Sequence, residues 1–143
     1  MKSQTILLVE DDHDDLELTL RTFRGGPLCH QVVVARNGLE ALDYLFSTGA
    51  YADQNPEPPT LVLLDLNLPK LSGLEVLQKI KNDERTRRIP VAVLSSSQWD
   101  LLSAESLRPG AVACLVKPVN REAVNQLAGK LGIPEWDNGG SNT

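Results

Sequence analysis

The 143-residue sequence has few cysteines, no long apolar run and no excess of positive charge. Its two cysteines, Cys29 and Cys114, lie far apart, which argues against a disulfide or a metal-binding cysteine pair. No segment approaches the length that crosses a membrane, and the apolar stretch near the N-terminus is too short for a secretion signal. We therefore expect a cytoplasmic protein with no membrane partner.

Basic residues are outnumbered by acidic ones. The 14 lysines and arginines against 19 aspartates and glutamates give a formal net charge of −5. A nucleic-acid-binding surface normally needs a basic patch, so we do not expect nucleic acid as a partner. Arg85, Arg87 and Arg88 cluster beside the acidic Asp83 and Glu84. We interpret this cluster as a solvated loop, with a docking patch as the alternative.

The chain does contain apolar runs that alternate with segments of helical periodicity. Its length and 41% hydrophobic content suit one domain with a core, predicted at residues 1–132, before an extension at 133–143. Strands are predicted at residues 5–9, 31–35, 61–64, 91–94 and 112–116. Helices are predicted at residues 14–24, 73–82, 99–107 and 120–131, and between the cap Asn37 and Gly49.

Strands that are each followed by a helix predict an α/β fold, a doubly wound five-stranded parallel sheet with helices on both faces. The expected strand order is 2-1-3-4-5, which opens a crevice between the first and third strands at their carboxyl ends. Residues 50–59, just before the third strand, are polar and contain prolines. We expect an extended surface loop there.

Asp65 ends the apolar third strand, where a lone buried carboxylate would be costly without a cation or a chemical role. The first strand ends in Glu10 and Asp11, which the predicted order brings to the same crevice. Because these carboxylates repel one another, we expect a divalent cation between them, and hard oxygen ligands favour Mg²⁺. Asp14 and Asp15 we interpret only as partners of a helix N-terminus.

The fourth and fifth strands end in Ser95 and Lys117, at the same edge of the sheet. A hydroxyl and an ammonium beside a metal-bound carboxylate best fit phosphoryl oxygens. Asp65 would then be a nucleophile that receives a phosphoryl group as an acyl phosphate. Taken singly, Lys117 fits a solvated lysine and Ser95 an ordinary turn residue, but their meeting at one edge favours the functional interpretation.

These residues belong to segments that resemble a known family. The segments are ILLVEDD at 6–12, LLDLNLP at 63–69, GLEVL at 73–77, IPVAVLS at 89–95 and LVKP at 115–118. Together they resemble the receiver domain of two-component response regulators, over nearly the whole chain. The resemblance implies a flavodoxin-like receiver fold and Mg²⁺-dependent transfer of a phosphoryl group from a sensor histidine kinase to an aspartate. It implies phosphoryl acceptance and slow autodephosphorylation, not a turnover enzyme.

The resemblance also implies roles for individual residues. Asp65 is the expected phosphoacceptor. Asp11 and Asp65 are the expected direct Mg²⁺ ligands, joined by the backbone carbonyl of Asn67, while Glu10 acts chiefly through water. Asp12 falls one place beyond the acid pair of the family and receives no metal role.

Ser95 takes the position of the switch hydroxyl, and Lys117 that of the lysine that contacts the phosphoryl group. The bond between Lys117 and Pro118 is implied to be cis. One departure is Cys114, which stands three places before Lys117, where many receivers have an aromatic switch residue. We therefore expect the signal to leave through the predicted helix at 99–107, the fifth strand and the geometry of a dimer.

The loop at 50–59, the arginine-rich turn and the lack of an output domain resemble single-domain regulators that partner bacterial phytochrome kinases. Without an output domain, a partner protein or a second copy must read the switch. The apolar Ile133, Pro134 and Trp136 lie beyond the last helix, where a free tail should be polar. We expect a homodimer helped by this extension; the alternative is that Trp136 folds back onto its own domain.

Two other classes of function stay open. A receiver-shaped scaffold would bind partners without being phosphorylated. A Mg²⁺-dependent phosphatase of the haloacid-dehalogenase type also uses an aspartate nucleophile at a strand end. In that class a second acid two residues further on acts as general acid and base, where this chain has Asn67, and the nucleophile ends the first strand rather than the third.

Overall fold

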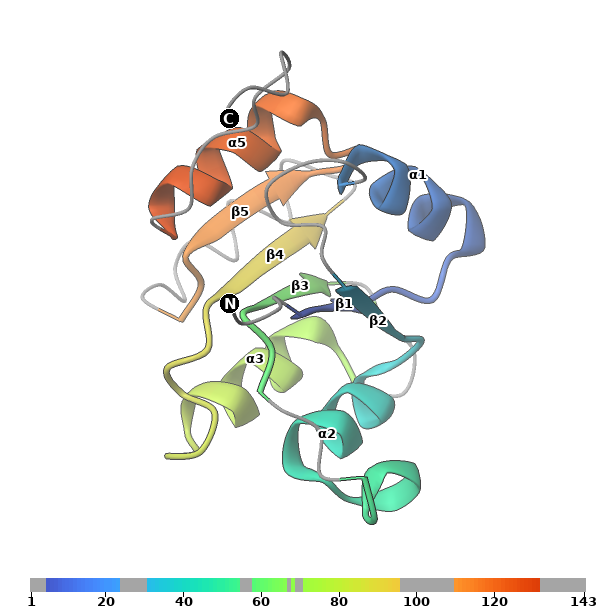
Figure 1. Ribbon diagram of the computed structural model, residues 1–143, viewed down its shortest axis with the longest axis vertical. Coiled ribbons are helices and arrows are strands. Elements are labelled where there is room, and N and C mark those ends of the chain that lie inside the picture. The colour runs from blue at the N-terminus through green and yellow to red at the C-terminus, as the bar shows by residue number, and fades with distance from the viewer. Residues whose placement is uncertain are drawn as a thin grey trace.

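The computed structural model describes residues 5–23, 31–54, 58–66, 68, 71–95 and 110–131. Five parallel strands form one sheet in the order β2-β1-β3-β4-β5 (Figure 1). The strands are β1 (Thr5–Val9), β2 (Gln31–Ala35), β3 (Leu61–Asp65), β4 (Val91–Ser95) and β5 (Ala113–Val116). The predicted α/β fold and its strand order are therefore confirmed.

Helices cover both faces of the sheet. They are α1 (His13–Phe23), α2 (Gly38–Phe46), the short 3₁₀ helix η1 (Gly49–Tyr51), α3 (Gly73–Lys81) and α5 (Arg121–Lys130). Helices α1 and α5 lie on one face, and α2 and α3 lie on the other (Figure 1). The helix predicted at 99–107 and the extension at 133–143 fall outside the described residues. Among the helices that are described, none is long and apolar enough to cross a membrane.

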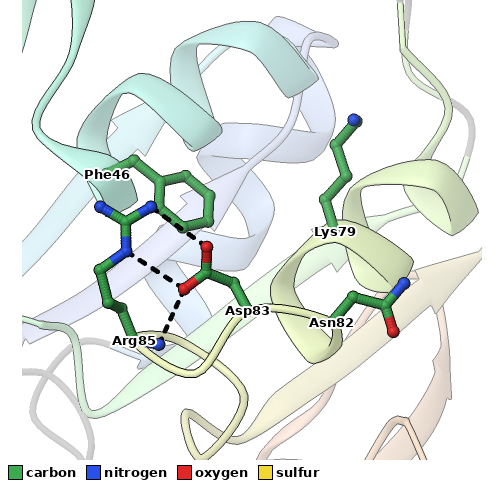
Figure 2. Close-up of a pocket in the computed structure, with 5 residues that line it drawn as sticks. All are labelled: Phe46, Lys79, Asn82, Asp83 and Arg85. Carbon is green, nitrogen blue, oxygen red and sulfur yellow. Dashed lines mark hydrogen bonds and ion pairs between the residues drawn. The ribbon is translucent and has the colours of Figure 1, made fainter.

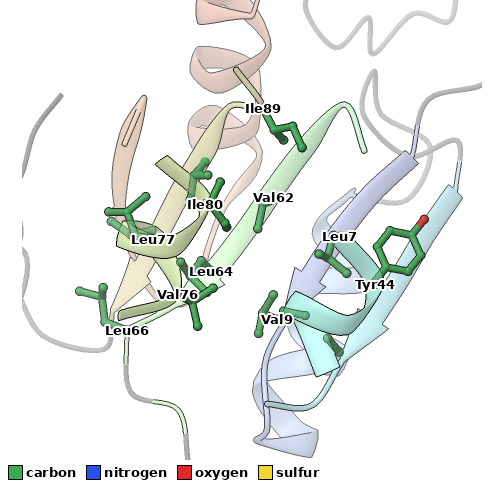
Figure 3. Close-up of a cluster of buried hydrophobic side chains, with 14 residues drawn as sticks. Leu7, Val9, Tyr44, Val62, Leu64, Leu66, Val76, Leu77, Ile80 and Ile89 are labelled. Carbon is green, nitrogen blue, oxygen red and sulfur yellow. The ribbon is translucent and has the colours of Figure 1, made fainter. Parts of the chain in front are cut away.

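The central strands are buried on both faces because helices pack against both. Alternate side chains of β1 and β3 enter two different hydrophobic clusters. The cluster toward α2 and α3 includes Leu7, Val9, Val62, Leu64, Val76 and Ile80 (Figure 3). The cluster toward α1 and α5 includes Ile6, Leu8, Leu61, Leu63, Leu16 and Leu127. This double burial explains why the strands are continuous apolar runs rather than alternating ones.

The strand register brings the polar strand ends to one edge of the sheet. Asp65 forms the last pair of β3 with β4, and Ser95 forms the last pair of β4 with β5. Glu10 follows β1 directly, and Lys117 follows β5 directly. Because all the strands are parallel, these four residues lie at the carboxyl edge, where α/β folds place their ligands.

Asparagine caps start two of the helices. Oδ1 of Asn37 accepts a hydrogen bond from the backbone N–H of Glu40 at 2.9 Å, so the predicted cap of α2 is confirmed. Oδ1 of Asn120 accepts from the N–H of Ala123 at 2.8 Å and caps α5 in the same way. These bonds satisfy N–H groups that the first helical turn leaves without partners.

The segment at 50–59 begins differently from the expected extended loop. Gly49–Tyr51 form η1, and a turn continues as far as residue 54. The ring of Tyr51 packs edge-on against Tyr44 of α2, with centroids 5.1 Å apart and an interplanar angle of 87°. Tyr44 is buried in the core, so this pair anchors the start of the segment. One aromatic residue in a polar stretch produces no periodic pattern, and the sequence therefore does not predict η1.

Candidate functional site

Glu10, Asp11 and Asp65 meet at the carboxyl ends of β1 and β3. The N–H of Glu10 donates to the carbonyl of Ala35 at 2.9 Å, and Oε2 of Glu10 accepts from the N–H of Asp12 at 3.1 Å. Glu10 is 1% exposed and Asp65 2%, whereas Asp11 is exposed. One carboxylate oxygen from each of the three acids lies within 4.8 Å of the others. The acids that the sequence predicts to converge are thus brought together.

Lys117 reaches this acid cluster from the end of β5. Its Nζ donates to Oε1 of Glu10 at 3.1 Å and to Oδ2 of Asp65 at 3.2 Å. A third and shorter bond, 2.8 Å, joins Nζ to Oδ2 of Asp15. The side chain of Lys117 is only 9% exposed, so these are charge-assisted hydrogen bonds with little competition from water.

Ser95 is fully buried at the end of β4. Its carbonyl accepts a hydrogen bond from the N–H of Lys117 at 2.7 Å, and the bond from Lys117 to Pro118 is cis, as the family resemblance implies. The backbone of β4 therefore fixes the start of the segment that carries the lysine. Asn67 lies outside the described residues, so the expected carbonyl ligand stays a prediction.

Asp15 does more than serve the N-terminus of α1, which is the role that its sequence position predicts. It accepts the shortest of the hydrogen bonds from Lys117, and its side chain is 35% exposed at the rim of the site. The helix itself is capped by Asp12, whose Oδ1 accepts from the N–H of Asp15 at 3.0 Å. No local pattern indicates the ion pair, because the two partners are 102 residues apart.

Gly73 is a second residue whose part in the site the sequence does not reveal. Its N–H donates to the carbonyl of Leu66 at 3.1 Å, at the start of α3. A Cβ on Gly73 would collide with the backbone oxygen of Asp65 and lie 2.6 Å from Cα of Leu66. The helix approaches the end of β3 this closely only because the residue has no side chain. The path of the backbone after Asp65 depends on this contact.

The charges of the buried groups depend strongly on one another. Burial raises the pKa of the Glu10 carboxyl to about 7, and a hydrogen bond and repulsion from Asp65 act in the same direction. Burial disfavours the charged form of Lys117, but its bond to Asp15 and the charges of Asp65 and Glu10 outweigh burial and raise the pKa of Lys117. The lysine therefore stays charged while the acids around it outnumber it.

The donor set fits a hard divalent cation. Carboxylate oxygens are the ligands that Mg²⁺ and Mn²⁺ prefer, and three are close enough to share one ion. Glu10, Asp11 and Asp65 carry more negative charge than Lys117 can balance. A cation held by these oxygens would remove that imbalance.

A hollow of about 380 Å³ lies away from these acids, at the carboxyl ends of α2 and α3 (Figure 2). Its lining residues are Phe46, Lys79, Asn82, Asp83 and Arg85. Nε and Nη2 of Arg85 each donate to Asp83 at 3.1 Å, and the guanidinium carbon lies 4.7 Å from the centroid of Phe46. Arg85 is thus held by partners although its side chain is 68% exposed, as in the solvated loop that we predict.

The comparison with protein families decides what kind of domain this is. Residues 6–128 match the family model of the response regulator receiver domain. The chain belongs to this family. It is therefore a receiver of two-component signalling, and receivers bind Mg²⁺ or Mn²⁺ at an acidic site such as the one formed by Glu10, Asp11 and Asp65. Receivers generally serve in signalling rather than in turnover catalysis.

Proteins similar to this receiver include other response regulators, one of them a bacteriophytochrome response regulator. The response regulator Rcp1 of Synechocystis sp. is 43% identical over 94 residues, which make up 66% of this chain and 63% of Rcp1, less than two thirds of its length. The structure of the bacteriophytochrome response regulator AtBRR has a TM-score of 0.86 at 45% identity and covers 93% of this chain and 95% of that one. The Mn²⁺-bound form of Rcp1 has a TM-score of 0.71 at 36% identity and covers 88% of this chain and 90% of that one.

Proposed function

We propose that this receiver accepts a phosphoryl group on Asp65 from a sensor histidine kinase in a Mg²⁺-dependent reaction. Phosphorylation then changes which protein surfaces the domain binds. The observation that supports this function is the position of Asp65, 3.2 Å from Nζ of Lys117 and within the 4.8 Å cluster of acid oxygens. The proposed nucleophile therefore lies together with the ammonium of Lys117 and the metal-binding carboxylates at the carboxyl edge of the sheet.

The reaction needs little from the protein beyond placing charges. A carboxylate oxygen of Asp65 forms a bond to phosphorus while the bond from phosphorus to the histidine nitrogen of the kinase breaks. The leaving imidazole keeps the electron pair of that bond and takes up a proton. The ammonium of Lys117 lies next to the attacking carboxylate, where it can stabilise the charge on the phosphoryl oxygens.

Glu10, Asp11 and Asp65 are the side chains that would hold Mg²⁺, joined by the carbonyl of Asn67 that the family resemblance implies. The bound ion supplies neutralisation of the carboxylates and of the phosphoryl group during transfer. Burial of Glu10 and Asp65 keeps water from screening these charges.

The change of state begins with the added charge on Asp65, which rises from about −1 to nearly −2 on phosphorylation. Ser95 and Lys117 are placed to follow this charge, since both end strands that neighbour the site. The backbone N–H of Lys117 donates to the carbonyl of Ser95, so we expect the segments that follow β4 and β5 to shift together. Cys114 is half-buried in β5 and packs against the cluster toward α2 and α3, where it replaces the aromatic relay of many receivers.

We propose a phytochrome-type histidine kinase as the phosphodonor, because AtBRR, a bacteriophytochrome response regulator, is 45% identical over 93% of this chain. We also propose a homodimer through the face of β5 and α5, with help from residues 133–143. The apolar Ile133, Pro134 and Trp136 of this extension support the proposal, because a free tail should be polar. Light scattering of the full chain and of a chain truncated after Leu131 tests the dimer; monomers in both cases contradict it.

Intact-mass measurement tests the proposed function. After incubation with Mg²⁺ and acetyl phosphate, the chain should gain one phosphoryl group, which Asp65→Asn abolishes. Asp53→Asn removes the same charge from an exposed turn and should keep the gain. Continuous phosphate release at enzyme-like rates would instead favour the phosphatase. No modification of a folded chain that binds Mg²⁺ would favour the scaffold.

A further inference from the structure

Lys117 is shared by carboxylates that cannot all remain its partners when a cation binds. Two of them, Glu10 and Asp65, belong to the cluster whose oxygens lie within 4.8 Å of one another. The third is Asp15, which makes the shortest bond to Nζ, 2.8 Å, and is not a member of that cluster. Asp15 is therefore the partner that a bound cation would leave in place.

A divalent cation and an ammonium compete for the same oxygens and repel each other. If a cation takes oxygens of Glu10 and Asp65, Nζ of Lys117 must move back from them. The proposed function requires the same ammonium beside the phosphoryl group, so Nζ must move without leaving the site. With its side chain 9% exposed, an ammonium that lost every counter-ion there would be costly.

We infer that Asp15 is a positioning residue, which holds Lys117 in the site while a cation occupies the other two carboxylates. This role rests on the proposed cation site. The 35% exposed side chain of Asp15 lies toward solvent, so the ammonium can shift in that direction without losing its charge partner. Without the Asp15 carboxylate, Lys117 retains only Glu10 and Asp65 as acidic partners among the described residues, and it competes with the cation for them.

Asp14 provides a matched control for Asp15. Both belong to the first turn of α1, and Asp14 is exposed and makes no ion pair in the part of the chain that the structure describes. Asp14→Asn and Asp15→Asn therefore remove the same charge from the same helix end. A difference between the two variants reports the contact with Lys117 rather than the helix dipole or the general potential of the site.

Titration of the full chain with Mn²⁺, with free Mn²⁺ followed by electron paramagnetic resonance, measures the effect. Asp15→Asn should weaken Mn²⁺ binding by about tenfold, which is within the range of coupling between contacting residues. Asp14→Asn should change it by less than about twofold, as expected for an exposed charge in salt. Asp15→Glu keeps a carboxylate at this half-exposed position and should stay close to the wild-type affinity.

A double-mutant cycle shows whether Asp15 acts through Lys117. In a Lys117→Met background, Asp15→Asn should have no larger effect than Asp14→Asn. If Asp15→Asn lowered the Mn²⁺ affinity equally with and without Lys117, or if Asp14→Asn and Asp15→Asn lowered it equally, the role of Asp15 would be overturned. Mn²⁺ binding by the wild-type chain would still support the cation site. A wild-type chain that binds no Mn²⁺ would overturn the proposed function as well. If circular dichroism shows that the Lys117 variant does not fold, the comparison among the Asp14 and Asp15 variants decides.

Discussion

The two ends of α3 lie next to two ion-pair groups of very different character. At its N-terminal end, Gly73 packs against Asp65, and Lys117 is 9% exposed among acids that outnumber it. Just beyond its C-terminal end, Arg85 is 68% exposed, bound to Asp83 and stacked on Phe46. The group around Lys117 is buried and has more negative than positive charges. The group around Arg85 is exposed, and its charges are paired one to one.

This difference indicates why the site lies where it does. An exposed ion pair such as Arg85 with Asp83 stabilises the fold little, because water and salt screen its charges. A buried group with excess acid has a free energy that depends on what neutralises it, whether a proton, a cation or a lysine. We therefore expect the carboxyl edge of the sheet to respond to ligands more strongly than the far end of α3.

The largest predicted effect is on the pH dependence of the free energy of unfolding, to which Glu10 contributes. Its pKa in the folded chain is about 7 against an ordinary value of 4.5, so the folded state holds this proton more tightly than the unfolded state does. Without divalent cations, the free energy of unfolding should therefore fall as pH rises from 4.5 through 7, by up to about 3 kcal/mol. Urea unfolding at pH 5 and pH 8, with chelator present, should show that Glu10→Gln loses most of this slope.

Asp83 supplies the control for this measurement from the exposed pair. Hydrogen bonds from Arg85 hold the pKa of Asp83 below its ordinary value of 3.8. Its contribution to stability is therefore present above pH 3.8 and is lost only as pH falls through the lowered pKa. Asp83→Asn should leave the slope between pH 5 and pH 8 unchanged. If wild type and Glu10→Gln had the same slope, the folded state would not raise the pKa of Glu10 as described above.

A smaller effect is expected from Gly73→Ala, which adds a methyl group behind the acid cluster. The new Cβ would collide with the backbone oxygen of Asp65, and overpacking of this kind costs about 1–3 kcal/mol. Gly129→Ala in α5 is the matched control, because no atom of the described residues lies within 4 Å of the added Cβ apart from the backbone of its own helix and its chain neighbours. That variant should gain about 0.5–1 kcal/mol from helix propensity. Urea unfolding of both variants checks the opposite signs, and a stable Gly73→Ala would mean that α3 does not constrain Asp65.

The smallest effect is expected at the exposed pair. Arg85→Ala should lower the free energy of unfolding only slightly, and high salt should reduce the loss. Arg88→Ala removes an exposed arginine of the same turn and should have almost no effect. Urea unfolding at low and high ionic strength measures both. A loss at Arg85 as large as that at Gly73 would remove the contrast between the two ends of α3.

Much of the sheet and its edge can be predicted from the sequence for a physical reason. A parallel strand that is buried on both faces must be an apolar run, and the first polar residue after the run marks its carboxyl end. Glu10, Asp65, Ser95 and Lys117 each mark such an end, and the strand order then places them at one edge. The asparagine caps are equally local, which is why the start of α2 at Asn37 is predicted correctly.

The features that cannot be predicted depend on contacts between distant parts of the chain. Asp15 looks like any acid in a first helical turn until Lys117, 102 residues away, is placed beside it. Gly73 looks like a helix start, and its close approach to the backbone of Asp65 appears only when α3 packs on β3. Tyr51 forms part of η1 and meets Tyr44 in the core, although its own segment is polar.

Trapping the acyl phosphate tests most directly whether Asp65 is the site of phosphorylation. Borohydride reduces an aspartyl phosphate to homoserine, and peptide mass mapping then locates the reduced residue. After treatment with acetyl phosphate, homoserine should appear at position 65 with Mg²⁺ and be absent with chelator. Homoserine at Asp11 or at another acid, or none in folded protein that binds Mg²⁺, would contradict the proposed function.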